Sequence, residues 1–292
     1  MVRQGCCIPM LKTRVSRRKL KRVVYHTLML LLTFTMAYPF LWAVFSSFKT
    51  SGQMFEGNPL TLIPRPFTLI NYERTLALLP FGMFLKNSII LSAAIPMLMI
   101  FFSSLCAYSL ARLRFKGRNF IFILFVATMM VPSHVTLIPN YILVSKLGWI
   151  DRYICLFAHA IFTGENAFNI FFFRQYFLSI PKDIEQAAII DGCGFAGVFF
   201  RIILPNSKPA IATVAILSFR AVWNSFLWPM LVINSFDKMT VTVGLQYYKG
   251  AVDNAAQVLS GVTLAIIPVI IVFIAFQKHF INSTLNSGFG GT

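Results

Sequence analysis

The feature that most constrains this chain is a series of apolar segments, each about 20 residues long, separated by short polar stretches. A helix of that length crosses the hydrocarbon core of a bilayer. Hydrophobic residues make up 57% of the chain and charged residues only 12%, which is about half the charged share of a soluble domain. The strands of a β-barrel would give shorter segments of alternating hydrophobicity. We therefore expect an all-α protein that spans a membrane several times.

Six apolar segments can be placed along the chain. They cover roughly 24–46, 87–111, 119–143, 153–175, 210–232 and 257–277. This assignment predicts one membrane domain over 24–277, preceded by a basic tail over 1–23 and followed by a C-terminal tail over 278–292. The connection over 47–86 contains four prolines, so we expect it to form a folded loop with short helices at most.

Basic residues are distributed unevenly between the two sides of these spans. Of the 26 Lys and Arg residues, 17 fall on one side and eight on the other, while Arg220 lies within a span. Because cytoplasmic loops are the richer in Lys and Arg, both termini are expected to be cytoplasmic. The basic stretch Arg14–Arg22 is expected to contact anionic lipid headgroups, and its placement beside a span argues against nucleic-acid binding.

Motifs for catalysis or metal binding are few. The five cysteines include no CxxC pair, and His134 and His159 have no second ligand at metal spacing, so we expect neither a metal site nor a disulfide framework. There is no GxxxxGK[ST] phosphate loop, since Gly244 is followed by Lys249 and then Gly250. The chain is therefore predicted not to be an enzyme, and any ATP hydrolysis belongs to another protein.

A polar island, Ile180–Pro209, separates the fourth and fifth apolar segments. Ser179 is a plausible N-cap, Pro181 suits a first helical turn, and Gly192 suits a helix end. A second short helix is expected over Phe195–Leu204. It would display three aromatic side chains: Phe195, Phe199 and Phe200. The residues thus predict a cytosolic helix–turn–helix elbow that fits a groove on a partner, with an amphipathic loop lying on lipid as the alternative.

The spacing of this island resembles the EAA loop of ABC-importer permeases, the segment that docks onto an ATPase. Ala187-Ala188, Asp191-Gly192 and Ile203-Leu204-Pro205 fall at the family's spacing. The family's EAA glutamate falls at Gln186, so its usual pairing with the ATPase is either absent here or taken over by Glu185. The resemblance assigns ATPase coupling to ten residues: Glu185, Gln186, Ala187, Ala188, Asp191, Gly192, Phe195, Phe199, Leu204 and Pro205.

The resemblance extends along most of the chain. Stretches similar to carbohydrate permeases of the maltose-transporter class, in particular to the smaller permease of the pair, are Ala107–Arg112, Phe115–Arg118, Met130–Pro132 and Trp223–Pro229. This implies a type I ABC importer permease fold with six transmembrane helices in the bacterial cytoplasmic (inner) membrane. It also implies a sister permease forming a heterodimer, two ATPase subunits that bind ATP and Mg, and an extracytoplasmic solute-binding protein that delivers carbohydrate. This chain would hold no cofactor of its own.

Two charged residues lie near the middle of predicted spans, Glu165 in the fourth and Arg220 in the fifth. Such residues are costly in a bilayer unless they are paired or face water, and they commonly line a pathway. We expect both to face the interior, where they either pair with each other or contact the solute. In the second case Arg220 would meet the carboxylate of an acidic, uronate-containing oligosaccharide. The predicted substrate path consists of Glu165, Asn166, Asn169, Arg220, Trp223 and Asn224.

The predicted path residues have other structural explanations, and the sequence also allows other functions. Interhelical hydrogen bonds would explain the asparagines, and interfacial anchoring would explain the tryptophans. A peptide or amino-acid permease of the same superfamily would have a similar island. An ion-coupled secondary transporter would need intramembrane acidic residues, for which Glu165 is the one candidate. A structural membrane protein would leave the island and the charged span residues unexplained.

Overall fold

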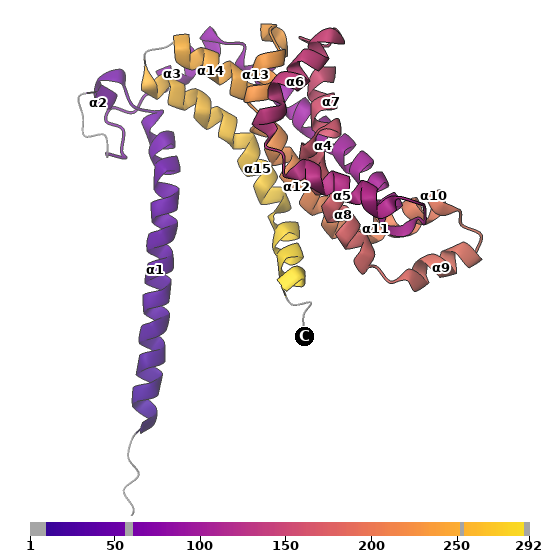
Figure 1. Ribbon diagram of the computed structural model, residues 1–292. Helices are drawn as coiled ribbons and strands as arrows, with labels where there is room; N and C mark the ends of the chain where they lie inside the picture. The colour runs from indigo at the N-terminus through magenta and orange to yellow at the C-terminus, as the bar shows by residue number, and fades with distance from the viewer. Residues whose placement is uncertain (1–9, 56–60, 252–253, 289–292) are drawn as a thin grey trace, which may run out of the picture. The chain divides into compact units, whose positions relative to one another are not determined.

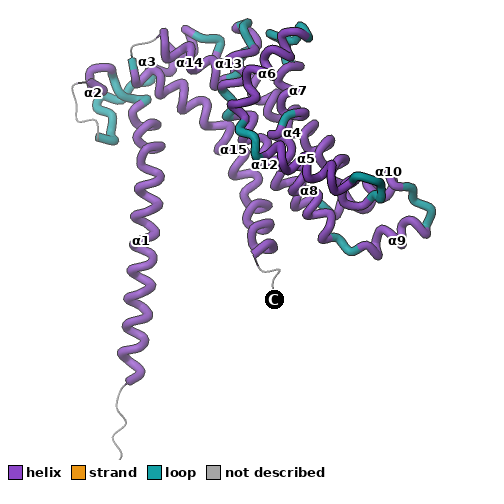
Figure 2. The backbone as a smooth tube through the Cα atoms, viewed as in Figure 1, coloured by secondary structure: helices purple, strands orange, loops and turns teal. Residues whose placement is uncertain are grey.

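The computed structural model describes residues 10–55, 61–251 and 254–288 of the chain. Within these ranges the chain forms helices joined by turns and loops, without a strand (Figures 1 and 2). The chain divides into two compact units. Unit 1 consists of Met1–Arg74 and Asn254–Thr263, and unit 2 of Thr75–Asp253 and Leu264–Thr292.

Unit 1 contains the first long apolar helix and the loop that follows it. Its helices are α1 (Met10–Ser46), α2 (Ser51–Phe55), the start of α3 (Ile70–Leu78) and the start of α15 (Ala255–Gly288). The Asn71 amide donates to the Ser47 and Lys49 carbonyls, both at 2.8 Å, and the Lys49 ammonium reaches the Thr61 carbonyl at 2.5 Å. These bonds confirm that the proline-rich connection is a folded loop with short helices.

Unit 2 contains most of the remaining helices. They are α4 (Phe81–Arg112), α5 (Arg118–Met129), α6 (Ser133–Lys146), α7 (Ile154–Phe162), η1 (Gly164–Asn166), α8 (Ala167–Ser179), α9 (Lys182–Ile190), α10 (Phe195–Val198), η2 (Phe199–Ile203, a π-helical turn), α11 (Leu204–Asn206), α12 (Lys208–Trp223), α13 (Leu227–Val232), η3 (Phe236–Lys238) and α14 (Val241–Ala251).

The spans agree with the six that were predicted, once bends are allowed for. Three helices are long and apolar enough to cross a membrane, namely Leu20–Ser46 of α1, α4, and Ala255–Ala275 of α15. Three further pairs of helices are long and apolar enough to cross a membrane when each pair is taken together. Each pair is bent at a short break: α5 with α6 by 102°, α7 with the η1–α8 segment by 52°, and the α10–α11 segment with α12 by 77°. Counting each pair once gives up to six spans among the described residues.

Three of the predicted spans are broken rather than continuous, and the third bends between α5 and α6. The fourth span is not one helix, because it breaks at Thr163 and resumes through the η1 turn. The fifth was expected to run to residue 232, but α12 ends at Trp223 and α13 follows as a separate short helix. Asn224 caps α12 by donating its N–H to the Arg220 carbonyl at 3.1 Å.

Helix α4 organises unit 2, since it packs along its length against α8 and α12. Its buried side chains recur every three or four residues, as expected for a helix that buries one stripe. Near its N-terminal end Phe84 is fully buried, in a cluster that includes Leu91 and Trp228. Near its C-terminal end Tyr108 packs with Phe173. These two clusters hold in place the two candidate sites described next.

Candidate coupling loop and membrane pocket

The polar island folds as the predicted elbow, with a glycine turn between two short helical stretches (Figure 1). Gly192 has a φ of +86°, the left-handed region that glycine adopts at helix ends, and its N–H donates to the Ile189 carbonyl at 3.0 Å. The predicted N-cap was wrong. Ser179 is the last residue of α8, and its hydroxyl donates backwards to the Tyr176 carbonyl at 2.7 Å.

The second stretch of the elbow exposes two of the three predicted aromatic rings. Phe195 is 65% exposed and Phe200 is 51% exposed, whereas Phe199 is buried. The prediction that Phe199 is displayed was therefore wrong. A π-helical turn begins at this residue and shifts side-chain positions from the α-helical pattern. The Phe199 ring packs 5.2 Å from the ring of Tyr108 on α4, so it anchors the loop rather than facing a partner.

Arg112, the last residue of α4, holds the loop to the rest of unit 2. Its side chain is almost fully buried, and its Nε lies 2.7 Å from a carboxylate oxygen of Glu185 on α9. Its Nη2 donates to the Phe177 carbonyl at 2.5 Å and to the Ile180 carbonyl at 2.6 Å. One guanidinium therefore joins the end of α4, the end of α8 and the first turns of α9.

This contact gives Glu185 and Gln186 different roles. Burial raises the pKa of the Glu185 carboxyl, while the charge of Arg112 opposes that shift. Since the Glu185 carboxylate is occupied inside the chain, it is not the group that faces a partner. Gln186 is exposed on the neighbouring surface of α9. Sequence reasoning missed Arg112 as the partner of Glu185, because 73 positions separate the two residues and no local pattern connects them.

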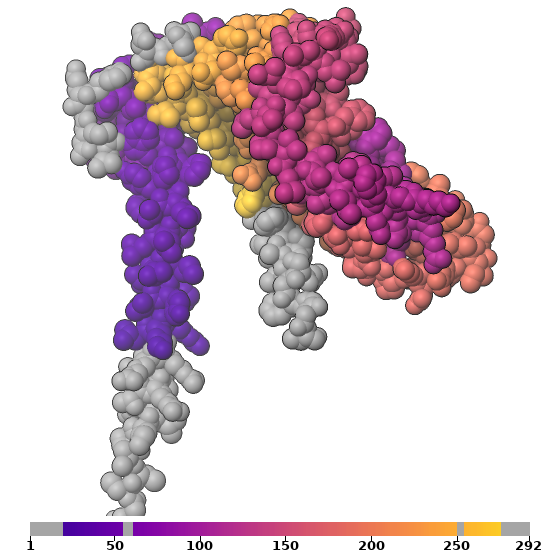
Figure 3. Space-filling view, viewed as in Figure 1, coloured from indigo at the N-terminus to yellow at the C-terminus, as the bar shows by residue number. Residues whose placement is uncertain are grey.

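The elbow exposes apolar side chains, and a basic groove runs beside α9. The exposed apolar residues include Ile189, Ile190, Phe195 and Phe200, of which Ile190 is 84% exposed. Of the other predicted coupling residues, Ala187, Asp191 and Pro205 are exposed, Leu204 is half-buried and Ala188 is buried. The surface of α5 borders that of α9 (Figure 3), and between them lies a groove of about 920 Å³ lined in part by Arg114, Lys116, Arg118 and Lys182.

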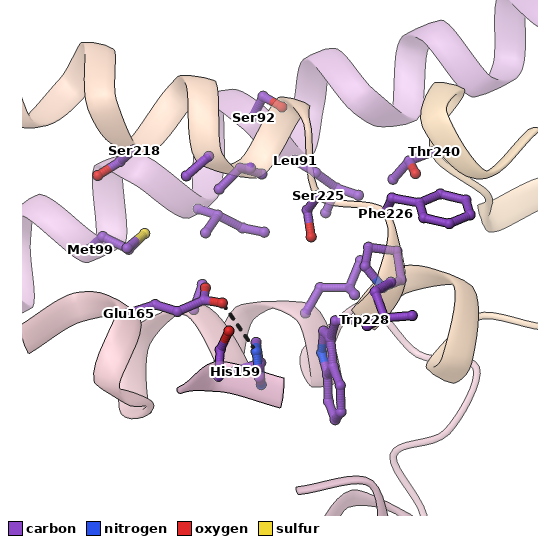
Figure 4. A pocket seen from close by; sticks show the side chains of 18 of the residues that line it. Leu91, Ser92, Met99, His159, Glu165, Ser218, Ser225, Phe226, Trp228 and Thr240 are labelled. Carbon is purple, nitrogen blue, oxygen red and sulfur yellow. Dashed lines mark ion pairs between the residues drawn. The ribbon is translucent and has the colours of Figure 1, made fainter. Parts of the chain in front are cut away.

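A second candidate site is a cavity of about 470 Å³ in unit 2 (Figure 4). Helices α4, α6, α7, α8, α12 and α13 contribute to its wall. Its polar lining residues are Ser88, Ser92, Ser133, His134, His159, Glu165, Asn169, Ser218, Ser225 and Thr240. The volume falls within the range of small-molecule sites, and a mostly apolar wall with a few polar groups is typical of them.

The break in the fourth span places one charged side chain on this cavity. Glu165 lies in the η1 turn, and its carboxylate is 3.5 Å from Nε2 of His159 (Figure 4). The His159 ring stacks on Trp228 with 4.2 Å between ring centroids, and the Trp228 indole donates to the Cys155 carbonyl at 3.2 Å. The position of Glu165 is therefore supported by a chain of packed and hydrogen-bonded groups.

Of the other predicted path residues, only Asn169 lines the cavity. Its amide donates to Asn166 Oδ1 at 2.9 Å and to the Ser218 hydroxyl at 3.2 Å, which links α8 to α12. The Ser218 bond of Asn169 is interhelical, whereas Asn166 donates locally to the Ile161 carbonyl at 3.3 Å. Trp223 is buried and stacks on Phe219 at 5.7 Å.

Arg220 does not pair with Glu165. It is an exposed residue of α12 and is not among the described residues that line the cavity. The ion pair of Glu165 is with His159. Asn224 is likewise exposed at the end of α12. A role for Arg220, Trp223 or Asn224 in the solute path stays a prediction.

Sequence reasoning missed much of the cavity wall. His159 and Trp228 were read as structural residues, and the small hydroxyl residues of α4 and α12 carried no signal. In hindsight Ser88 and Ser92 occur four residues apart in an apolar run, a spacing that places both on one helix face. The described residues hold no group of three or more His, Cys, Asp or Glu that could bind a metal ion.

Comparison with known proteins identifies the family. Residues 99–285 match the binding-protein-dependent transport system inner membrane component. The chain belongs to this family. The match covers both the elbow and most of the cavity wall, so the two candidate sites lie within the shared part of these transport components.

The chain is similar along most of its length to permease proteins of sugar transport systems and to a solved transporter structure. The chain is 37% identical to the arabinooligosaccharides transport system permease protein AraQ of Halalkalibacterium halodurans, over 89% of this chain and 93% of the relative. It is 32% identical to the trehalose/maltose transport system permease protein MalG of Thermococcus litoralis, over 90% and 95%. A solved bacterial ABC transporter involved in the import of the acidic polysaccharide alginate superposes with a TM-score of 0.79 at 25% identity, over 90% and 97%.

Proposed function

We propose that this chain is a membrane-spanning permease subunit of an ATP-driven importer for carbohydrate. It forms half of the translocation path and docks an ATPase through residues 180–209. Its relatives include permease proteins for arabinooligosaccharides and for trehalose and maltose, with nearly full coverage of both chains. The ATPase, with its ATP and Mg, a sister permease and an extracytoplasmic solute-binding protein are the partners that this function requires.

The observation that carries the proposal is the construction of the elbow. Its inner side is fixed to unit 2 by Arg112 and by the buried Phe199, while its outer side presents Ile190 and Phe195 to the surroundings. An exposed apolar face on a short helix suits a groove on a partner. Because the inner side is fixed, a push on the outer face is transmitted to α4 and α8 rather than absorbed by the loop.

The mechanism is alternating access. Closure of two ATPase subunits moves the elbow as a nearly rigid element, and the paired permeases rock so that their shared path opens outward. Solute delivered by the binding protein enters, and ATP hydrolysis restores the inward-open state. The solute or its carrier must bind the two states with different affinity, since otherwise it shifts no equilibrium. This chain performs no covalent chemistry.

The test is co-purification from the native membrane. We expect a sister permease and an ATPase to be recovered with the intact chain. Ile190→Asp and Phe195→Asp should reduce ATPase recovery at least about tenfold, because a charge in the core of an apolar interface is poorly tolerated. Recovery of the sister permease should not change, which reports on folding. An intact chain that purifies alone, or variants that retain the ATPase fully, would refute the proposal.

A further inference from the structure

We propose that the cavity of unit 2 admits uncharged saccharides and that Glu165 is the residue that excludes acidic ones. This inference rests on the proposed carbohydrate function and names the substrate class of the same protein. It starts from a difference among relatives, whose names cover arabinooligosaccharides and trehalose or maltose on one side and acidic alginate on the other. Sequence similarity does not distinguish importers of uncharged saccharides from importers of acidic ones. The charged residues of the cavity provide a basis for the distinction.

The cavity is lined by one acidic side chain and by no lysine or arginine among the described residues. The acidic side chain is that of Glu165. The two histidines on the wall are His134 and His159, and His159 faces Glu165. The exposed Arg220 does not line the cavity. A ligand carboxylate entering here therefore meets a fixed carboxylate and no permanent cation.

The ion pair with His159 orients the half-exposed side chain of Glu165. Its side chain is 50% exposed, while its partner His159 is only 9% exposed and is clamped against Trp228. Figure 4 shows Glu165 and His159 directed toward each other at the edge of the cavity. A break in a membrane helix that carries a polar group into a cavity is a common construction of solute sites.

The rest of the wall suits hydroxyl groups. Serine and threonine hydroxyls donate and accept, and an asparagine amide does both, so each can satisfy a sugar hydroxyl. Such groups come from α4, α6 and the turn after α12, as Ser92, Ser133 and Ser225 show. A uronate would lose its hydration on entry and face a like charge, a repulsive element that discriminates against it. A neutral saccharide of the same shape has no such penalty.

The experiment compares two trisaccharides that share their ring stereochemistry and differ at C6. The assembly that co-purifies with the chain is titrated calorimetrically with mannotriose and with trimannuronate, in which each hydroxymethyl group is a carboxylate. We expect the intact assembly to prefer mannotriose by at least about tenfold. Glu165→Gln, which keeps the side-chain shape and removes its charge, should reduce this preference about tenfold by improving trimannuronate binding. Glu165→Asp, the matched control, should keep the preference.

Each other outcome counts against a specific claim. Equal affinity of the intact assembly for both sugars, or a preference unchanged in Glu165→Gln, overturns the charge selection. Equal weakening of both sugars in Glu165→Gln would make Glu165 a residue that only maintains the cavity, which also overturns it. If neither sugar binds although the ATPase co-purifies, the cavity does not admit these saccharides and the inference fails, while the proposed importer function stands on the co-purification.

Discussion

At the scale of single residues, the buried pair of Arg112 and Glu185 is the contact on which the coupling loop depends most. Removal of one partner of a buried ion pair costs about 3–5 kcal/mol, because the other charge stays buried without compensation. In Arg112→Leu the carbonyls of Phe177 and Ile180 also lose their donor. We expect a lower melting temperature and a loss of ATPase from the purified assembly. Thermal unfolding followed by tryptophan fluorescence and quantitative mass spectrometry measure the two effects.

Two variants show whether charge or geometry matters at this position. Arg112→Lys keeps the charge but cannot bridge a carboxylate and two carbonyls with one planar group, so only partial rescue is expected. Arg152→Ala removes an exposed arginine outside the coupling loop and the groove beside it, and it should leave both readouts unchanged. If Arg112→Leu has the same melting temperature as the intact chain and retains the same amount of ATPase, the anchoring role assigned to Arg112 is incorrect.

At the scale of elements, the packing of α14 on α4 depends on a glycine. A Cβ built on Gly244 would lie 2.3 Å from Cδ2 of Phe84, whose side chain is fully buried. Gly244→Ala therefore forces α14 away from α4 or Phe84 out of its cluster, at a cost of about 1–3 kcal/mol. Gly82→Ala is the matched control, because its Cβ meets nothing within 4 Å and alanine favours helix. Melting temperatures should fall for Gly244→Ala and hold or rise slightly for Gly82→Ala.

The same scale shows what the sequence determines and what it does not. Apolar segments of spanning length and the glycine at position 192 are local signals, and they predicted the six spans and the elbow correctly. At the break in the fourth span, a Cβ on Gly164 would lie 3.0 Å from the Thr128 carbonyl oxygen, so the missing Cβ allows a close approach there. That contact, like the pairing of Arg112 with Glu185, joins segments far apart in the chain. Local patterns carry no information on such contacts, so the cavity and the loop anchor were not predicted.

At the scale of the whole molecule, contacts between distant segments decide how apolar helices of similar appearance are ordered, and Asp151 makes several such contacts. It precedes α7 with a positive φ of 60°, and its N–H donates to the Val232 carbonyl at 2.7 Å. Its carboxylate accepts the Ser235 N–H at 2.8 Å and the Ser235 hydroxyl, and it pairs with Lys238 at 2.9 Å. One side chain thus joins the connection before α7 to the connection after α13.

This cluster predicts a specific dependence of stability on pH. The bonds from Ser235, followed by the bond from Lys238, hold the pKa of the Asp151 carboxyl well below its usual range. A depressed folded-state pKa stabilises the fold at every pH above the unfolded value of about 3.9, and this contribution is lost as the pH falls through the folded-state pKa. Asp151→Asn should therefore lower the free energy of unfolding by about 2 kcal/mol at pH 7. The difference from the intact chain should shrink progressively below about pH 4.

The control for this measurement is Asp237→Asn, which removes an exposed carboxylate from the same connection. It should leave the melting temperature unchanged at pH 7 and at pH 3. If Asp151→Asn lowers the free energy of unfolding equally at both pH values, the negative charge of the Asp151 carboxylate does not stabilise the fold. In that case the tie between the two connections would rest on the Asp151 N–H and on the Lys238 bond to the Asp151 carbonyl, both of which survive the substitution.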